Sequence, residues 1–141
     1  MKIIYTKVVA DLFHIGHVNF FRNARALGDK LVVHVVDDAR VTKAKRCPIM
    51  NQADRIALVS ACKYVDEAKA DGPVIITREF MNRHGYDIYA FAVSGEEDLA
   101  SKLVHCPDLP SKMLGILTRT PGISTSDLIC RILAKGVNGN D

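Results

Sequence analysis

The sequence predicts an α/β fold, in which helices cover both faces of an open parallel sheet. Strand-length runs rich in β-branched residues alternate with helical patterns, and several of these helices carry recognisable caps. Such an alternation implies parallel strands joined by helices. Because 141 residues suit one core, we expect one domain over residues 1–135 and a flexible tail over residues 136–141.

Each element has its own signal in the sequence. The expected strands, marked by β-branched and apolar runs, are residues 3–9, 31–36, 74–76, 88–93 and 114–117. Apolar residues at helical spacing and capping residues mark the helices. These are residues 18–27 before Gly28, residues 56–62 after an Asn51–Asp54 capping pair, a short helix from Thr77 to Gly85, and a last helix opened by Ser124 and Asp127.

Composition and charge argue against several classes of function. No apolar run approaches the roughly 20 residues that cross a bilayer, and the N-terminus lacks the apolar region of a signal peptide. Four scattered cysteines without a Cys-x-x-Cys pair indicate reduced thiols, so we expect a cytoplasmic protein and no metal held by cysteines. A net charge of +3 is too small to indicate nucleic acid. The cluster of Lys43, Lys45 and Arg46 suits a small anionic ligand better.

The first chemical motif follows the first strand, at the sheet edge where ligands of parallel sheets bind. His14 and His17 are three residues apart at a helix start, so their rings can face one side, near the positive end of the helix dipole. Gly16 leaves room for a phosphate to approach the backbone. Two histidines can also be ordinary surface or core residues. Their place between strand and helix favours phosphoryl chemistry, in which fixed donors stabilise transition-state charge.

The second motif runs from Arg119 to Asp127 and follows the fifth strand. A cation, a glycine and three hydroxyl groups lead into a helix N-terminus, which makes a second anion cradle at the same edge of the sheet. Ser124 alone could serve as a helix cap. Capping, however, requires neither Arg119 nor Thr125.

Together the two motifs resemble the cytidylyltransferase family that acts on glycerol 3-phosphate, phosphocholine and phosphoethanolamine. The segment Arg119-Thr120-Pro121-Gly122-Ile123-Ser124-Thr125-Ser126-Asp127 is the specific part, because the His14 to His17 element alone also fits adenylyltransferases. The resemblance extends to Arg55 and to the segment from Cys62 to Glu67. It implies a Rossmann-like nucleotidyltransferase fold, the use of CTP with Mg²⁺ on its triphosphate, and a homodimer paired near residues 62–67.

The resemblance also implies roles for individual residues. The expected catalytic residues are His14, His17, Lys45 and Arg119. The expected nucleotide site comprises Val9, Ala10, His14, Gly16, His17, Lys45, Arg119, Gly122, Ile123, Ser124, Thr125 and Ser126. The expected acceptor site comprises Lys7, Asp11, Lys45 and Arg78. An oxygen of the acceptor's phosphate would attack CTP directly and in line, and no dedicated metal ligand is visible.

Three departures from the family pattern bear on the acceptor. Lys7 stands where choline and ethanolamine enzymes often have aspartate, the chain has no tryptophan, and Ser94-Gly95-Glu96-Glu97 replaces a histidine-glycine-aspartate-aspartate element. The Val-Ala-Asp-Leu-x-His variant also resembles cytidylyltransferases of phosphonate biosynthesis. We therefore expect a hydroxyalkyl phosphonate or glycerol 3-phosphate as acceptor. The alternatives are phosphoethanolamine, an adenylyltransferase activity and a nucleotide-binding regulator without catalysis.

Overall fold

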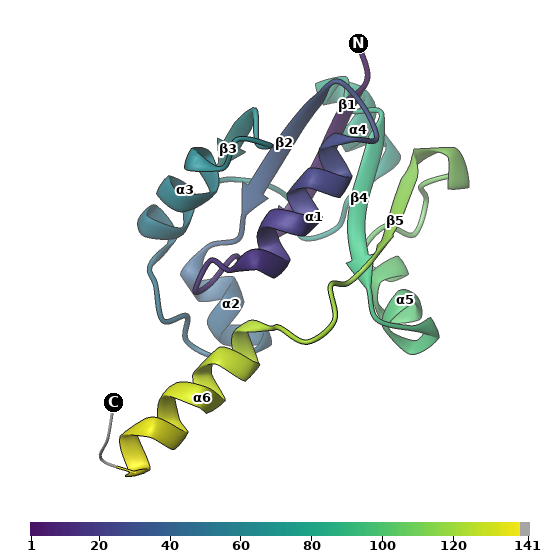
Figure 1. Ribbon diagram of the computed structural model, residues 1–141. Coiled ribbons are helices and arrows are strands. Elements are labelled where there is room, and N and C mark those ends of the chain that lie inside the picture. Colours follow the sequence, from purple (N-terminus) through teal and green to yellow (C-terminus); the bar gives the residue numbers. More distant parts are fainter. Residues whose placement is uncertain (139–141) are drawn as a thin grey trace.

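A computed structural model describes residues 1–138 and contains a five-stranded parallel sheet with helices on both faces (Figure 1). The strands are β1 (Ile3–Val8), β2 (Lys30–Val35), β3 (Glu67–Lys69), β4 (Ile88–Val93) and β5 (Leu114–Thr118). Their order is β3-β2-β1-β4-β5, and every neighbouring pair is parallel. The chain moves outward from β1 to β3 and then returns to β4. The carboxyl ends of β1 and β4 therefore form a topological switch point, the usual ligand site of such sheets.

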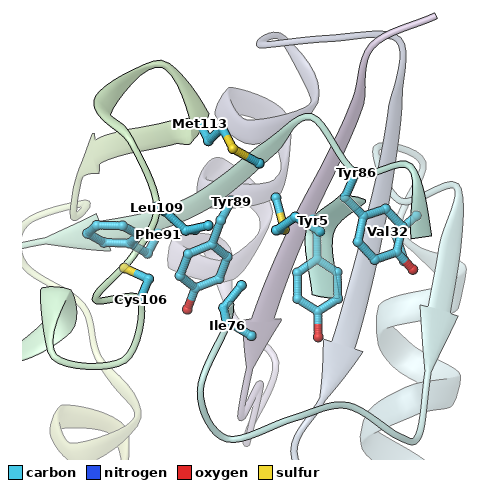
Figure 2. Close-up of a cluster of buried hydrophobic side chains, with 10 residues drawn as sticks. Tyr5, Val32, Ile76, Tyr86, Tyr89, Phe91, Cys106, Leu109 and Met113 are labelled. Atoms are coloured by element: carbon cyan, nitrogen blue, oxygen red, sulfur yellow. The ribbon is translucent and has the colours of Figure 1, made fainter. Parts of the chain in front are cut away.

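The helices divide between the two faces of the sheet. They are α1 (Ile15–Arg25), α2 (Asp38–Ala44), α3 (Gln52–Ala61), α4 (Arg78–His84), α5 (Glu96–Leu103), the 3₁₀ turn η1 (Ser111–Met113) and α6 (Thr125–Asn138). Ile4 of β1 belongs to a core shared with Phe21 of α1 and Val59 of α3. Tyr5, pointing the other way, packs with Met81 of α4 and Met113 of η1 (Figure 2). Alternation along β1 thus supplies both cores.

Most of the expected elements and caps are confirmed. The Asn51 side chain accepts the N–H of Asp54 at 2.9 Å, and Thr77 caps α4, which ends at Gly85 in the left-handed conformation. Ser124 accepts the N–H of Asp127 at 3.1 Å. These side chains satisfy backbone donors that a helix start leaves without partners.

The expected third strand was wrong. Residues 74–76 form a loop, in which Val74 is exposed and the N–H of Ile76 bonds to the carbonyl of His105. The third strand is instead β3, whose short sequence Glu-Ala-Lys carries no β-branched signal. It forms because an edge strand needs only the backbone of β2 to pair with.

Two helix ends also differ from expectation. Helix α1 ends at Arg25, and Gly28 is not a left-handed cap: a Cβ there would lie 2.7 Å from the carbonyl oxygen of Lys2, so close backbone approach requires the glycine. Helix α6 extends through Asn138 and includes the first three residues of the expected tail. The remainder of that tail, residues 139–141, lies outside the described residues.

Candidate active site

A cavity of about 650 Å³ lies at the carboxyl ends of β1, β4 and β5. The expected site residues that line it are Lys7, Val9, Ala10, Asp11, His14, Gly16, His17, Lys45, Arg119, Ile123, Ser124, Thr125 and Ser126. Gly122 and Arg78 are not among the lining residues. Arg78 begins α4, and its N–H bonds to Asp108. The structure thus brings together both motifs and the basic residues after α2.

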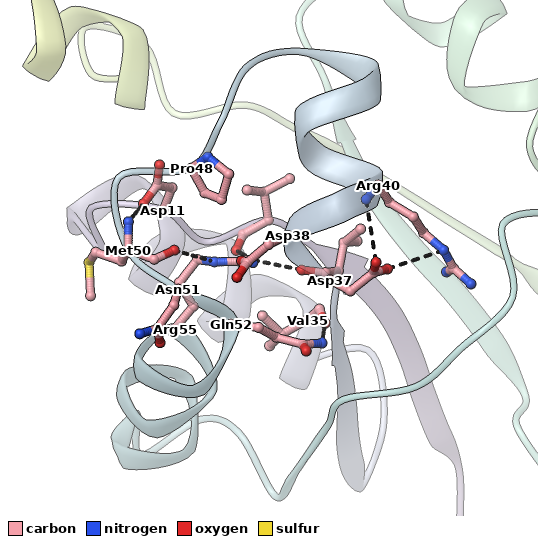
Figure 3. Close-up of polar contacts among 12 residues, drawn as sticks. Asp11, Val35, Asp37, Asp38, Arg40, Pro48, Met50, Asn51, Gln52 and Arg55 are labelled. Carbon is pink, nitrogen blue, oxygen red and sulfur yellow. Dashed lines mark hydrogen bonds and ion pairs between the residues drawn. The ribbon is translucent and has the colours of Figure 1, made fainter.

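The turn between β1 and α1 is held in an unusual conformation. Ala10 and Leu12 have φ angles of 56° and 48°, values that residues other than glycine rarely adopt. The carboxylate of Asp11, which is 2% exposed, accepts the N–H groups of Leu12, Ile49 and Met50 at 2.8–3.1 Å. Both carboxylate oxygens are therefore engaged by the backbone, and Figure 3 shows Asp11 beside Met50. Asp11 thereby fastens the turn to the loop after α2. It also lines the cavity, and its expected role at the acceptor stays a prediction.

His14 and His17 form a reciprocal cap at the start of α1. Nδ1 of His14 accepts the N–H of Gly16 at 3.0 Å, and Nδ1 of His17 accepts the N–H of His14 at 3.1 Å. A ring nitrogen that accepts carries no proton, so each neutral ring has its hydrogen on Nε2. A Cβ on Gly16 would lie 2.7 Å from Cε1 of His14, so the ring packs against a position that only glycine fits.

Burial keeps both rings neutral. It lowers the pKa of His17 to about 4, with His14 adding to the effect, and it also lowers the pKa of His14. Imidazolium ions are therefore absent from the site near neutral pH. The two rings can serve as Nε2–H donors, which suits stabilisation of phosphoryl oxygens without proton transfer.

Lys45 follows α2 and faces the second motif across the cavity. Desolvation beside the cavity wall and the nearby guanidinium of Arg119 lower its pKa. Arg46, part of the basic cluster expected to suit a small anionic ligand, also lines the cavity. The loop that carries these cations is fixed by the bonds from Ile49 and Met50 to Asp11.

The segment from β5 to α6 is tied to the β1–α1 turn. The N–H of Arg119 extends the pairing with β4 by bonding to the carbonyl of Val93 at 2.9 Å. The hydroxyl of Thr125 donates to the backbone carbonyl of Asp11 at 2.9 Å, and Asn19 donates to the hydroxyl of Thr120 at 3.3 Å. These contacts explain the hydroxyl groups that helix capping leaves unexplained.

Arg55 fixes the backbone around the site by hydrogen bonds. Its guanidinium is fully buried and donates to the backbone carbonyls of Val9, Val36 and Met50 at 2.8–2.9 Å, and it also pairs with Asp38 (Figure 3). One side chain thereby joins the ends of β1 and β2 to the start of α3. This structural role suits the rigid, many-donor guanidinium group.

The lining residues that sequence reasoning missed include two basic ones, Lys102 of α5 and His105 beyond it. Nζ of Lys102 donates to the carbonyl of Ala92 at 2.9 Å and lies 3.9 Å from Asp98, which also lies 3.8 Å from Arg119. The signal that could have identified Lys102 is its place on α5, the helix that directly follows β4 and so begins at the switch point. Glu96 and Glu97 begin this helix and do not line the cavity.

No group of three or more His, Cys, Asp or Glu side chains in residues 1–138 is arranged to hold a metal ion. Within the same residues, none of the helices has the length and apolar character needed to span a membrane.

Comparisons with known proteins agree with the motifs. Residues 9–131 match the family model described as cytidylyltransferase-like. The chain is 37% identical over 133 residues to the ethanolamine-phosphate cytidylyltransferase of Dictyostelium discoideum, an alignment that covers 92% of this chain and 36% of that protein. It is 34% identical over 137 residues to choline-phosphate cytidylyltransferase A of Mus musculus, covering 92% of this chain and 36% of that protein.

The chain spans about a third of the length of the curated relatives that it matches. Among solved structures, the lipopolysaccharide core biosynthesis protein from Thermoplasma volcanium GSS1 superposes with a TM-score of 0.67 at 24% identity, covering 87% of this chain and 99% of that one. This likeness shows a shared α/β fold. The family match and the sequence relatives confirm the resemblance drawn from the two motifs, and the chain belongs to the cytidylyltransferase-like family.

Proposed function

We propose that the chain transfers a cytidylyl group from CTP to the phosphate of a small phosphorylated alcohol. In this reaction an oxygen of the acceptor phosphate bonds to the α-phosphorus of CTP. The bond from that phosphorus to the bridging oxygen breaks, and pyrophosphate leaves with the electron pair. The observation that carries the proposal is the meeting of two motifs, 114 positions apart at Asp11 and Thr125, on one cavity.

The charges of the cavity support two anionic ligands bound together. Its lining includes five lysine and arginine side chains, namely Lys7, Lys45, Arg46, Lys102 and Arg119. Asp11 is the one carboxylate among the lining residues of the described chain, and backbone N–H groups occupy it. A triphosphate beside an acceptor phosphate requires such an excess of cations. A single small monoanion would not require five cationic side chains.

In the proposed mechanism, the Nε2–H groups of His14 and His17 donate to oxygens of the reacting phosphates. Lys45 bridges nucleotide and acceptor, because its flexible ammonium can follow the charge as it moves. The nucleotide is held by Arg119 and by residues 123–126, which lead into α6. Gly16 and the backbone of Val9 and Ala10 lie beneath it. No general base is needed, since a phosphate oxygen is already ionised at neutral pH.

Magnesium is expected only as a companion of the triphosphate. The carboxylate of Asp11 is engaged by the backbone, and Asp98 lies beside Lys102 and Arg119. The side chains present thus do not fit a metal cage held by the protein, and the mechanism above has no step that depends on one. Triphosphate oxygens and water are ligands that magnesium accepts readily.

The relatives bear on the choice of acceptor. The Dictyostelium protein is named for ethanolamine phosphate, as is a Mus musculus protein that is 36% identical over 126 residues, covering 87% of this chain and 30% of that protein. These names favour phosphoethanolamine, our alternative, over the hydroxyalkyl phosphonate or glycerol 3-phosphate that the motifs led us to expect. Phosphoethanolamine is therefore the first acceptor to test.

A pyrophosphate-release assay tests the proposal. CTP and ATP are each offered with phosphoethanolamine, phosphocholine, glycerol 3-phosphate and 2-hydroxyethylphosphonate, and products are identified by mass spectrometry. Release that requires both CTP and an acceptor supports the proposal. A preference for ATP would make the chain an adenylyltransferase. Tight CTP binding without release from any pair would make it a non-catalytic nucleotide-binding module.

We also propose a homodimer, because the segment from Cys62 to Glu67 that the family uses for pairing is present. In the protomer Asp66 already bonds to the N–H of Leu31 and pairs with Arg25. Light scattering at micromolar concentration should give twice the protomer mass of 15.5 kDa. A monomer mass under these conditions would contradict the proposal.

A further inference from the structure

Three basic residues, on β1, on α5 and just after α5, line the same cavity and are here called its cationic end. They are Lys7 at the end of β1, Lys102 of α5 and His105. Nζ of Lys7 and the backbone carbonyl of His105 both bond to the loop of residues 74–76. Burial lowers the pKa of His105, and the charges of Lys7 and Lys102 lower it further. None of these residues belongs to the triphosphate cradle formed by α1 and the start of α6. Lys7 and His105 are therefore available to the part of the acceptor that does not react. Lys102 lies between them and the nucleotide residues, because Asp98 is 3.9 Å from Lys102 and 3.8 Å from Arg119.

Lys7 is held in place with donors to spare. Its Nζ donates to the carbonyl of Val74 at 2.6 Å, which uses one of three ammonium hydrogens. His34 is the residue of β2 that pairs with Lys7 in the sheet. Desolvation lowers the pKa of Lys7, and the charge of Arg40, which pairs with Asp37 at 3.2 Å, contributes further to lowering it. His34 is 1% exposed, and neither ring nitrogen has a hydrogen-bond partner in the described structure. Lys7 is thus fixed by a neutral carbonyl and not by a carboxylate.

Within the described residues, the carboxylates near this end already have partners. Asp98, which lies 3.9 Å from Nζ of Lys102, also accepts the N–H of Ser94 at 2.9 Å. Asp11, the one lining carboxylate of the described chain, accepts three backbone N–H groups. Tyr89 and Phe91 do line the cavity, but they are only 4% and 5% exposed. Figure 2 shows both rings within the core cluster, where Cys106 and Leu109 also lie. An ammonium group needs an open aromatic face or a free carboxylate.

From these contacts we infer that Lys7, Lys102 and His105 bind the far end of the acceptor and select hydroxyl or anionic oxygen groups there over an ammonium group. The inference rests on the proposed function and specifies its acceptor class. A lysine within about 4–6 Å of an acceptor ammonium disfavours binding, whereas the same lysine donates well to oxygen. Such selection would separate this chain from the relatives named for ethanolamine phosphate and choline phosphate.

The test compares kcat/KM for glycerol 3-phosphate and 2-hydroxyethylphosphonate with kcat/KM for phosphoethanolamine. We expect the wild type to favour one of the oxygen-ended acceptors by about tenfold or more. Lys7→Met and Lys102→Met keep the size of the side chain and remove its charge, and each should lower that ratio about tenfold. Lys112→Met is the matched control, because Lys112 is exposed on η1 and outside the cavity. Its ratio should equal that of the wild type.

The outcomes separate this inference from the proposed function. Turnover with a preference for phosphoethanolamine, or ratios unchanged in both lysine variants, would overturn the inference and leave the function standing. Absence of turnover with every acceptor would overturn the function. In that case calorimetry with CTP present still decides the inference: glycerol 3-phosphate must bind the wild type more tightly than phosphoethanolamine, and Lys7→Met must remove the difference. Equal or reversed affinities would refute it.

Discussion

The backbone N–H of His14 donates to Nδ1 of His17, and the two imidazole rings lie with their centroids 3.9 Å apart. Two imidazolium ions at this separation would repel each other strongly. The contact therefore fixes two things at once, the start of α1 and the neutral tautomer of both rings. It links helix capping, a matter of local structure, to the donors that phosphoryl chemistry needs.

Replacing His17 should lower turnover more than stability. Removing one fixed donor to a developing charge costs about 10²–10³ in rate. His17→Asn is the informative change, because its side-chain oxygen can still accept the N–H of His14 while the Nε2–H is lost. The measurement is kcat for CTP with the best acceptor, and His84→Ala, an exposed histidine on α4, serves as control. Near-normal kcat in His17→Asn would remove His17 from the mechanism.

The buried histidines should make the fold sensitive to mild acid. Burial lowers the pKa of His17 and of His34 to about 4, below the usual 6.5. Between these values the unfolded chain binds more protons than the folded one, so stability rises with pH across this range. The stability that these histidines contribute is fully present above about pH 6.5 and is lost as the pH falls toward 4. From pH 7 to pH 5 each histidine should cost about 2 kcal/mol.

Urea unfolding at pH 7, 6 and 5 measures this loss. His17→Asn should lose about 2 kcal/mol less than the wild type over the same range, since Asn does not titrate. A wild-type stability that stays constant from pH 7 to pH 5 would show that His17 and His34 are not shielded from solvent as described.

The sequence predicted the fold class and the elements that carry both motifs, whereas the roles of the site residues stay predictions. Both motifs sit where parallel strands end, and the capping signals at Asn51, Thr77 and Ser124 predicted three helix starts. By contrast, β3 pairs through its backbone alone, so its side chains carry no signal. Asp11 was assigned to the acceptor because the family resemblance implies that role. Its bonds to Ile49 and Met50 are long-range contacts that no local pattern contains.

Arg55 should be among the most sensitive positions for stability. Arg55→Met would leave the carbonyls of Val9, Val36 and Met50 buried without their donor, and Asp38 without its partner. Breaking a buried, hydrogen-bonded charge typically costs about 3–5 kcal/mol. The measurement is the free energy of unfolding in urea. The control is Arg83→Met, which breaks an exposed pair with Glu79 and should change stability by less than about 1 kcal/mol. A loss below 1 kcal/mol for Arg55→Met would contradict its place in the site.

Gly16→Ala should impair catalysis through the position of one ring. The new methyl group would lie 2.7 Å from Cε1 and 2.9 Å from Nδ1 of His14, so the ring must move away. That movement breaks the bond from the Gly16 N–H to His14 and displaces the Nε2–H donor. A displaced donor costs about as much as a missing one, so kcat should fall about 10²-fold.

Gly136→Ala is the matched control: it lies in α6 with no heavy atom within 4 Å of the added Cβ, and alanine favours a helix interior over glycine by about 1 kcal/mol. The control should keep full activity and unfold at equal or higher urea concentration. If Gly16→Ala also keeps full kcat, the position of the His14 ring does not limit the reaction, and the donor role assigned to His14 is wrong.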